Sequence, residues 1–326
     1  MMQASRYAFI HGKIHGIMAK SYVDSRIESL LRYANLLELS RRLFPSQEVS
    51  TLERDLIRDI QRKFENQTIA TLVKILSYLP KPPAILVQVL REYDYRNLKT
   101  LLRAKKTGLR DLPLWDISPY GEVPLDYDGF PENLKDTGFW DLVSRMGEKE
   151  LFDLEFELDK RYYAELAGHA ADLPARERKI MGPLVSLEIT LQNLIWSLRL
   201  RYYFSLPWEK VEKLLFPTGY GEIPLLAKNL YALPFDEPAQ WEKNRYGRIL
   251  RAGQSGEITP EGAEGAGMKH LHRRIRRVFY GRPFTLSSLY AFFRLKLYEA
   301  GLVTSVSEGI RMSIPPARLA EILGTL

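Results

Sequence analysis

Two carboxylates that lie close together, Glu92 and Asp94, are candidates for acid–base catalysis by residue type and spacing. Such chemistry needs further groups that exchange a proton or attack a substrate, and neither a histidine nor a nucleophile accompanies them. Glu92 instead precedes Arg96 by four residues, the spacing of an ion pair on a helix, which typically contributes about 0.2–0.5 kcal/mol. We therefore expect both carboxylates to be structural.

A pair of histidines, His11 and His15, has the four-residue spacing of metal ligands on one face of a helix. The pair lacks the intervening glutamate of a zinc protease, and no third ligand can be identified in the sequence. Gly12 and Gly16 beside the histidines instead suggest that this helix packs closely against another one. We expect no metal and no cofactor.

The densest basic segment is residues 269–284, KHLHRRIRRVFYGRPF. Its arginines form a candidate docking face for phosphates or acidic protein loops, and they are Arg273, Arg274, Arg276, Arg277 and Arg282. Alternatively, they are the solvated side of a helix whose other face repeats apolar residues from Leu271 onward. His270 and His272 are a poor metal site, because the neighbouring arginines would repel a cation.

Three stretches are expected to be loops. Residues 109–134 and 216–238 are dense in Pro, Gly and Asp, and residues 252–267 contain five glycines and should form a mobile linker. Within this linker, residues 262–267 have the order G-x-x-G-x-G, which superficially resembles a nucleotide-binding loop. No strand precedes it and no Gly-Lys-Ser/Thr follows, so we expect no nucleotide hydrolysis here.

The elements that would position these residues are helices almost throughout. Apolar residues recur every three or four positions from residue 82 to 101, and residues 187–200 are apolar on two faces, as in a helix packed on both sides. Ser50 and Glu53 have the spacing of a capping box, so a helix should start there. Further helices are predicted over residues 7–20, 26–43, 50–64, 149–166, 241–251, 269–279, 286–307 and 316–323.

Length and composition limit the class of protein. The chain has 326 residues, enough for two or three domains, and its 45% apolar and 27% charged residues are ordinary for a folded protein. It has no cysteine, which excludes disulfides, thiolate metal sites and a cysteine nucleophile. No stretch is as apolar over about 20 residues as a membrane span requires. A net charge of +7 is modest for this size and decides little about partners.

An internal repeat is the most informative feature of the sequence. The signature Glu92, Asn97 and Arg103 recurs at an offset of 96 residues as Glu188, Asn193 and Arg199. The turn that follows recurs too, since YGEVPL at residues 120–125 matches YGEIPL at residues 220–225. Both asparagines lie on or beside an apolar face, so we expect their amides to fix helix packing through hydrogen bonds.

A third copy is fainter. Residues 205–207 (SLP) match residues 313–315 (SIP) at an offset of 108, and in that register Asn193 falls on Gly301. The polar signature is lost in this copy, whereas the order of helices survives. Three related helical units of about 100 residues each are the simplest account.

These motifs, in this order, resemble the C subunit of the bacterial and archaeal V/A-type rotary ATPase, a relative of the d subunit of the eukaryotic V-ATPase. The N-terminal helix leads into RIESLL at residues 26–31, and residues 92–105 carry the first signature. Residues 158–163, LDKRYY, add to the match, as does the Pro-x-Gly turn after each of the first two long helices. The resemblance extends over essentially the whole chain.

The resemblance implies an all-α fold in which three similar helical domains form a funnel with pseudo-threefold symmetry. The turn positions place these domains at residues 1–118, which include the N-terminal helix, at residues 119–221 and at residues 222–326. We expect each domain to consist of a shorter helix, a long helix, a turn and a short helix that a proline opens.

The resemblance also implies a function without catalysis. A protein of this family links the central stalk, with its D- and F-type subunits, to the membrane ring of proteolipid subunits. It turns with the rotor and transmits torque for coupled ion transport. It would lie in the cytoplasm, associated with the membrane through the complex and without inserting into it. In this interpretation the arginines of residues 269–284 dock on an acidic surface of the rotor.

An alternative is a basic helical repeat protein that binds nucleic acid through residues 269–282 and 103–106. Tyr280 and Phe284 would allow base stacking, but the motifs of small RNA-binding modules are missing. Phosphate contacts release counterions, so such binding would weaken steeply as salt rises. The favoured interpretation expects no nucleic acid.

Overall fold

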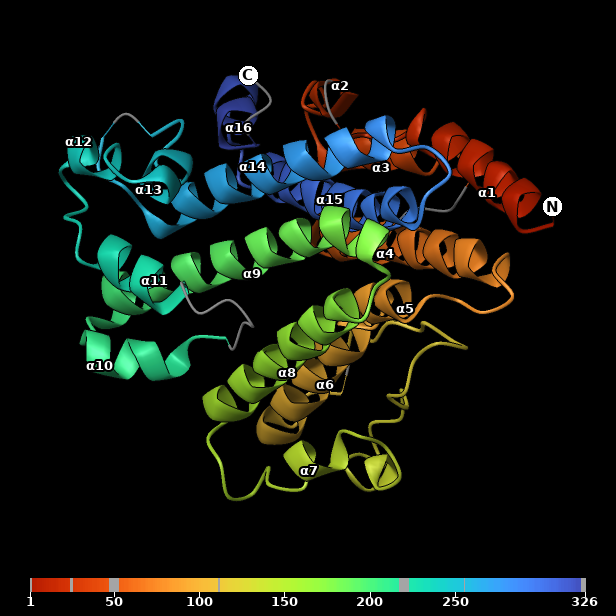
Figure 1. The fold of residues 1–326 in the computed structure, drawn as a ribbon, viewed down its shortest axis with the longest axis horizontal. Helices are drawn as coiled ribbons and strands as arrows, with labels where there is room; N and C mark the ends of the chain where they lie inside the picture. The colour runs from red at the N-terminus through yellow and green to blue at the C-terminus, as the bar shows by residue number, and fades with distance from the viewer. Residues whose placement is uncertain are drawn as a thin grey trace.

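A computed structural model describes residues 2–23, 26–46, 53–110, 112–216, 223–254 and 256–323. Over these residues the secondary structure is helical and contains no strand, so the predicted all-α class is confirmed (Figure 1). The longer helices are α1 (Met2–Met18), α4 (Glu53–Ser77), α6 (Glu92–Thr107), α8 (Leu151–Ala171), α9 (Ala175–Phe204), α14 (Pro260–Gly281) and α15 (Leu286–Arg311).

Shorter helices connect and cover these long ones. They are α2 (Ile27–Leu30), α3 (Leu36–Leu43), α5 (Ala84–Leu90), α7 (Trp140–Val143), α10 (Trp208–Val211), α11 (Ile223–Tyr231), α12 (Pro238–Trp241), α13 (Arg245–Leu250) and α16 (Pro316–Leu323), with 3-10 turns at Glu132–Leu134 and Glu212–Leu214. Two predicted helices are each broken in two. Residues 82–101 form α5 and the start of α6. Residues 26–43 form α2 and α3, and the side chain of Asn35 caps α3 by accepting a hydrogen bond from the Glu38 amide.

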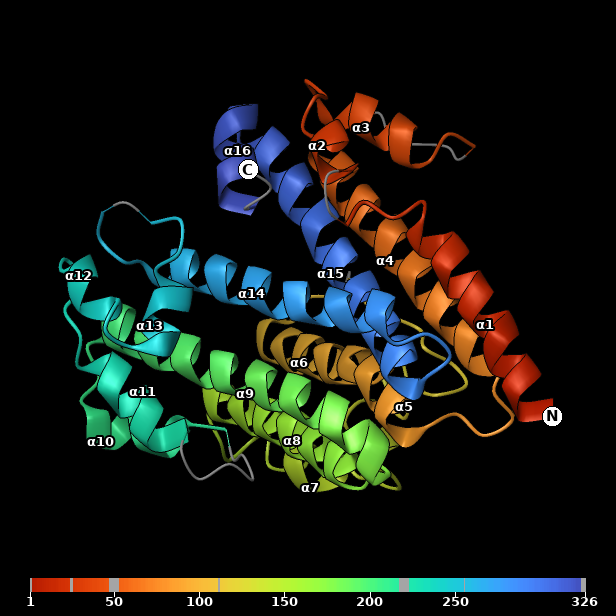
Figure 2. The same ribbon diagram turned by 45° about the horizontal axis from the view of Figure 1, so that its top comes forward.

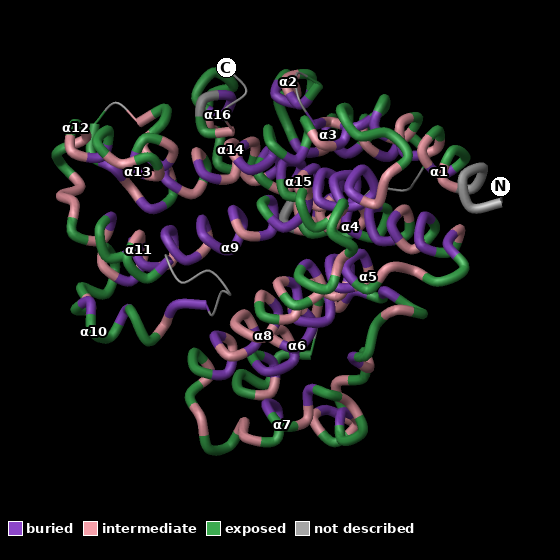
Figure 3. The backbone as a smooth tube through the Cα atoms, viewed as in Figure 1, coloured by how far each residue is buried: buried purple, intermediate pink, exposed green. Residues whose placement is uncertain are grey.

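The long helices pack in a closed cycle. Helix α4 contacts α5, which leads into α6; α6 packs on α8, α8 on α9, α9 on α14, α14 on α15, and α15 returns to α4. The two-faced burial predicted for residues 187–200 is present, because α9 is buried between α8 and α14 along this stretch (Figure 3). The cycle therefore leaves none of these helices with only one neighbour.

Two apolar clusters fill the interior. The larger cluster runs from α1 through the middle helices to the first half of α15. The smaller one joins α2, α3 and the start of α4 to the second half of α15 and to α16. Helices from opposite ends of the described chain therefore share one core, and Figure 2 shows α2, α3 and α16 at the same end of α15.

The predicted linker at residues 252–267 is wrong in its second half, because α14 begins at Pro260. The Thr259 side chain accepts a hydrogen bond from the Gly262 amide and Pro260 occupies the first turn, which together start a helix despite the glycines. Gly267 faces the protein interior, where an added Cβ would lie 3.2 Å from Leu250 Cδ2. The position therefore has little room for a larger side chain.

The second and third copies of the repeat share the same backbone conformation after their long helices. Ser205 follows α9 and Ser313 follows α15, and both have left-handed backbone with φ of 49° and 54°. In each copy a proline two residues later opens a short helix, α10 or α16. The predicted start at Ser50 and the second Pro-x-Gly turn at residues 217–222 lie outside the described residues.

The helical character of residues 260–267 can be tested with two glycine substitutions. Gly265→Ala should stabilise the chain by about 0.5–1 kcal/mol, because alanine is the better helix former and nothing closer than 3.7 Å obstructs its Cβ. Gly267→Leu should destabilise it by about 1–3 kcal/mol through overpacking against α9 and α13. Urea denaturation measures both, and two neutral substitutions would contradict a packed helix here.

Candidate functional site

A buried charge centre joins the three helices that carry the repeat. Arg294 of α15 forms ion pairs with Glu92 of α6 through Nη1, at 3.2 Å from Oε2, and with Glu188 Oε1 of α9 through Nη2. The two glutamates of the repeat signature thus meet on one guanidinium from the third copy. Because all three helices contribute a charge, the centre fixes how they cross.

The surroundings of Arg294 are largely shielded from water. The Arg294 and Glu188 side chains are 10% and 3% exposed, and Arg294 also donates to the hydroxyl of Tyr162, which donates to Glu92 Oε2. Burial opposes the charged form of Arg294, but nearby Tyr162 and Glu92 hold its pKa above the usual value. Burial also raises the pKa of Tyr162, so its hydroxyl keeps its proton.

The sequence analysis did not identify Arg294 as a site residue. It interrupts the apolar run LYAFF at residues 289–293, and a charged side chain in a buried helix requires a partner. This need for a partner was the signal in the sequence that could have revealed the buried ion pair. The predicted ion pair between Glu92 and Arg96 is wrong: Glu92 pairs with Arg294, whereas Arg96 pairs with Glu65 of α4 at 3.0 Å.

The two signature asparagines make the same pair of hydrogen bonds. The Asn97 amide donates to the Trp115 carbonyl at 2.8 Å and accepts from the Trp115 amide at 2.9 Å. Asn193 binds Phe216 in the same way, at 3.2 and 2.6 Å. Both asparagines are fully buried, so each one secures the segment that follows its long helix against that helix.

The signature arginines lie further along α6 and α9, nearer to solvent. Arg103 forms a bidentate pair with Glu155 of α8, at 2.5 and 2.6 Å, and Arg199 pairs with Glu264 of α14 at 2.6 Å. Each arginine thus reaches the next helix of the cycle. Half-exposed pairs of this kind contribute little stability individually, but they set the register between neighbouring helices.

Asp94 does not work together with Glu92. Its carboxylate accepts a hydrogen bond from the Glu122 amide at 2.9 Å and lies 3.6 Å from Arg91 Nε, on a different side of α6 from the charge centre. Burial raises the pKa of Asp94 to about 6, although the Glu122 amide and Arg91 oppose this shift. The two carboxylates therefore tie α6 to two different parts of the chain.

The predicted docking arginines all lie on exposed positions of α14 or directly after it. Arg273, Arg274, Arg277 and Arg282 have no ion pair among the described residues, and Arg276 lies over the ring of Tyr280. We call the stripe formed by these five arginines the α14 arginine stripe. Its positive field is visible at His270: burial lowers the pKa of this side chain, and the surrounding arginines lower it further.

The histidines occupy packed positions. The rings of His11 and His15 lie 4.1 Å apart, and His15 stacks on Phe279 at 4.4 Å. Burial lowers the pKa of both, so they are neutral at pH 7. His272 stacks on Tyr298 at 3.5 Å, and burial lowers its pKa to about 4. In the described part of the chain, no three His, Asp or Glu side chains converge as metal ligands would.

The close packing expected from Gly12 and Gly16 is wrong. Nothing lies within 4 Å of a Cβ added at either position, because both glycines are on the solvent side of α1. The face of α1 that packs inward carries Ile10, Ile14 and Met18 instead.

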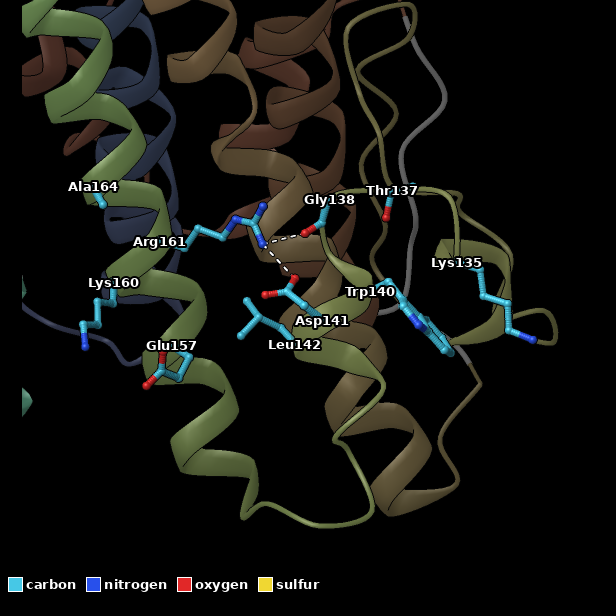
Figure 4. Close-up of a pocket in the computed structure, with 10 residues that line it drawn as sticks. All are labelled: Lys135, Thr137, Gly138, Trp140, Asp141, Leu142, Glu157, Lys160, Arg161 and Ala164. Carbon is cyan, nitrogen blue, oxygen red and sulfur yellow. Dashed lines mark hydrogen bonds and ion pairs between the residues drawn. The ribbon is translucent and has the colours of Figure 1, made fainter.

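A hollow among the described residues lies between α8 and the segment that contains α7 (Figure 4). It has a volume of about 710 Å³ and is open to solvent. Arg161 crosses it from α8 to bind the Gly138 carbonyl at 2.6 Å and Asp141 at 3.1 Å. No histidine lines the hollow, and Arg161 is already bound to Gly138 and Asp141. Arg161 therefore braces residues 135–142 against α8.

Crossing a bilayer takes a helix of about 20 predominantly apolar residues. Among the described helices, none combines this length with that apolar character.

The charge centre predicts a large loss of stability when its cation is removed. Arg294→Met would leave Glu188 buried without a counter-charge and should lower the free energy of unfolding by about 3–5 kcal/mol. The double variant R294M/E188L should recover most of this loss. Arg311→Met, on the same helix in an exposed pair with Glu308, is the control and should cost less than about 1 kcal/mol. Urea denaturation provides the measurement, and equal losses for Arg294 and Arg311 would contradict the role of the centre.

Asp94 predicts a pH dependence. Its pKa of about 6 in the folded chain exceeds the usual 3.8, so the folded state binds this proton more tightly than the unfolded one. Ionisation of Asp94 therefore lowers the free energy of unfolding as pH rises from about 4 to about 6.

Asp94→Asn keeps an oxygen for the Glu122 amide and removes this ionisation. Relative to the unaltered chain, it should gain stability across that pH window, by up to about 3 kcal/mol. Denaturation series at several pH values test this, with the exposed Asp153→Asn as control. A difference between D94N and the unaltered chain that does not change with pH would refute the assignment.

Comparison with known proteins identifies the family. The chain matches a family model described as the ATP synthase (C/AC39) subunit over residues 10–322. It is 27% identical to an uncharacterized protein of Treponema pallidum (strain Nichols), covering 97% of this chain and 96% of that protein. It is 24% identical to the C subunit of the A-type ATP synthase of Pyrococcus abyssi, covering 98% and 90%. The match to the C subunit of the A-type ATP synthase of Methanosarcina mazei is 30% identical but covers 47% and 45%. The resemblance seen in the sequence is thus confirmed, and the chain belongs to the ATP synthase (C/AC39) subunit family.

Proposed function

We propose that this chain is a non-catalytic subunit of a rotary ATP synthase or ATPase that links the central stalk to the membrane ring and transmits torque between them. The match to the family model over residues 10–322 carries this proposal. Relatives that align over most of the chain include the C subunit of an A-type ATP synthase. Its expected partners are the D- and F-type stalk subunits and the proteolipid ring, which would hold it at the membrane from the cytoplasmic side.

The packing of the long helices supports a mechanical role. A part that transmits torque must resist shear between its elements, and here each long helix of the cycle has neighbours on both sides. The buried pairs of Arg294 hold three of these helices at one point. We propose that the three units, at residues 1–118, 119–221 and 222–326, surround a pseudo-threefold axis and form a funnel.

The α14 arginine stripe is our proposed docking face for an acidic surface of the rotor. Four of its five arginines lack an ion pair among the described residues, so an acidic partner would find uncompensated charges there. Guanidinium groups suit this role, because they bind carboxylates in bidentate geometry. Such docking would be sensitive to salt.

Copurification tests the proposal. Expressed with the stalk subunits and the ring of its own complex, the chain should join them stoichiometrically. The variant R273E/R274E/R277E should weaken attachment to the rotor, and raising the salt concentration should weaken attachment of the unaltered chain. The control K210E/K213E/K243E makes the same change in charge at exposed lysines elsewhere and should leave attachment intact.

A chain that stays outside a complex whose other subunits assemble would contradict the proposed function. Fluorescence anisotropy with oligonucleotides at low and high salt examines the alternative. Tight binding at low salt that is lost in R273E/R274E/R277E would favour a nucleic-acid-binding protein instead.

A further inference from the structure

The N-terminal helix α1 is covered by the rest of the molecule on one side only. Ile10 and Ile14 on its inner side are fully buried, whereas Gly12 and Gly16 on its outer side face solvent. Figure 2 shows α1 at one edge of the molecule. A terminal helix that is covered on one side is the kind of element that opens locally while the remainder of a protein stays folded.

Two histidines of α1 pack against the end of α14 and the turn that follows it. The His15 ring stacks on Phe279 at 4.4 Å and lies edge-on to Tyr280 at 5.9 Å. The His11 ring lies 4.5 Å from the Phe284 ring, and the two imidazoles are 4.1 Å apart. Both imidazoles therefore belong to a cluster of aromatic rings that joins the first helix to the last third of the chain.

Each of the two histidines has one ring nitrogen that is shielded from water and has no hydrogen-bond partner among the described residues. These atoms are Nδ1 of His11 and Nε2 of His15. In a neutral imidazole one nitrogen carries no proton, and this state fits a site without an acceptor. Protonation would create a charged N–H donor with nothing to bind, and burying such a group is costly. The packing of α1 therefore favours neutral rings.

The charges beside the histidines on α1 and α14 are positive. The charge of His15 disfavours a charge on His11. On α14 the neighbouring cations belong to the arginine stripe, in which Arg276 lies over the ring of Tyr280 and Arg282 follows the helix. Positive charges near an imidazole oppose its protonation. A proton on either ring would therefore meet repulsion from α1 itself and from the helix on which it packs.

The carboxylates on the other elements near α1 are engaged with other groups. Glu177 of α9 acts on Tyr7 and accepts hydrogen bonds from the amide and hydroxyl of Ser287. Glu299 of α15 pairs with Lys296. Further charged or titratable groups on these elements are Lys13 over Tyr78, Glu65 paired with Arg96, the exposed Lys74 of α4, and Tyr290 and Arg294 beside the charge centre. Burial lowers the pKa of both histidines, and among the described residues no carboxylate acts to raise it.

We propose that His11 and His15 form a pH-sensitive latch, which holds α1 against α14 and the following turn while both rings are neutral and releases it when they are protonated. A detached α1 would carry both imidazoles in water, where histidine has its ordinary pKa of 6.5. Detachment therefore takes up protons, and the docked state is increasingly disfavoured as the pH falls below 6.5. The latch acts within this one chain, so it does not depend on whether the chain joins a rotary complex.

The size of the effect follows from the number of histidines. Between pH 7.5 and 5.5, each histidine that stays neutral in the docked state shifts the equilibrium about tenfold toward detachment, and two shift it about a hundredfold. Detachment would uncover Ile10, Ile14 and the ring of Phe279, which are fully buried while α1 is docked.

Hydrogen–deuterium exchange of the full chain, followed by mass spectrometry, tests the latch. Rates at pH 7.5 and 5.5 are each divided by the rate of the unfolded chain at the same pH. Protection of residues 7–18 should fall by up to about a hundredfold at pH 5.5, whereas α9 keeps its protection. The variant H11F/H15F keeps the aromatic contacts without a titratable group, so its α1 should be equally protected at both pH values. H11Q/H15Q should lose the pH dependence as well.

The matched control is H169F/H270F, which replaces two histidines on α8 and α14 and should keep the pH dependence of α1. Equal protection of α1 in the unaltered chain at both pH values would overturn the latch. A fall in protection that persists in both H11F/H15F and H11Q/H15Q would overturn it too, because other groups would then cause the opening. Loss of the pH dependence in the control would assign it to the other histidines, and a parallel fall in α9 would show unfolding of the whole chain instead.

Discussion

The arrangement of the long helices depends on one buried cation. Removing the guanidinium of Arg294 and the carboxylate of Glu188 from water costs free energy, and this cost is offset only where the groups meet with good geometry. Arg294 meets Glu92 and Glu188 only if α6, α9 and α15 cross at one place. The apolar clusters would tolerate some sliding of helix on helix, whereas the ion pairs select one crossing. The ion pairs of Arg294 thus decide how the three helices cross, and burial of apolar side chains stabilises that arrangement.

The buried charge centre and the exposed α14 arginine stripe differ in whether their charged side chains have partners of opposite charge. The charge centre has its ions paired, whereas the α14 arginine stripe has most of its arginines without a counter-charge among the described residues. These arginines contribute to the net charge of +7, and their field can attract an acidic partner.

Helical periodicity and the internal repeat were readable from the sequence, because both depend on the spacing of residue types along the chain. Asn97 and Asn193 could be identified as packing residues for that reason. Arg294 could not be assigned as the partner of Glu92 and Glu188. The third copy of the repeat supplies the opposite charge, so it does not share the pattern that reveals the first two copies. The glycines of residues 262–267 misled in another way: composition suggests flexibility, but Gly267 is small because Leu250 approaches it. Contacts between distant segments decide such positions, and spacing alone does not contain them.

The return of α15 to α4 has a consequence for how the chain folds during synthesis. More than 200 residues separate the end of α4 at Ser77 from the start of α15 at Leu286. On the ribosome, α4 must therefore wait for most of the chain before its main partner emerges. Contacts of such long sequence separation slow folding, and the apolar face of α4 stays uncovered in the meantime. The nascent chain is thus most exposed to aggregation just before its last long helix is made.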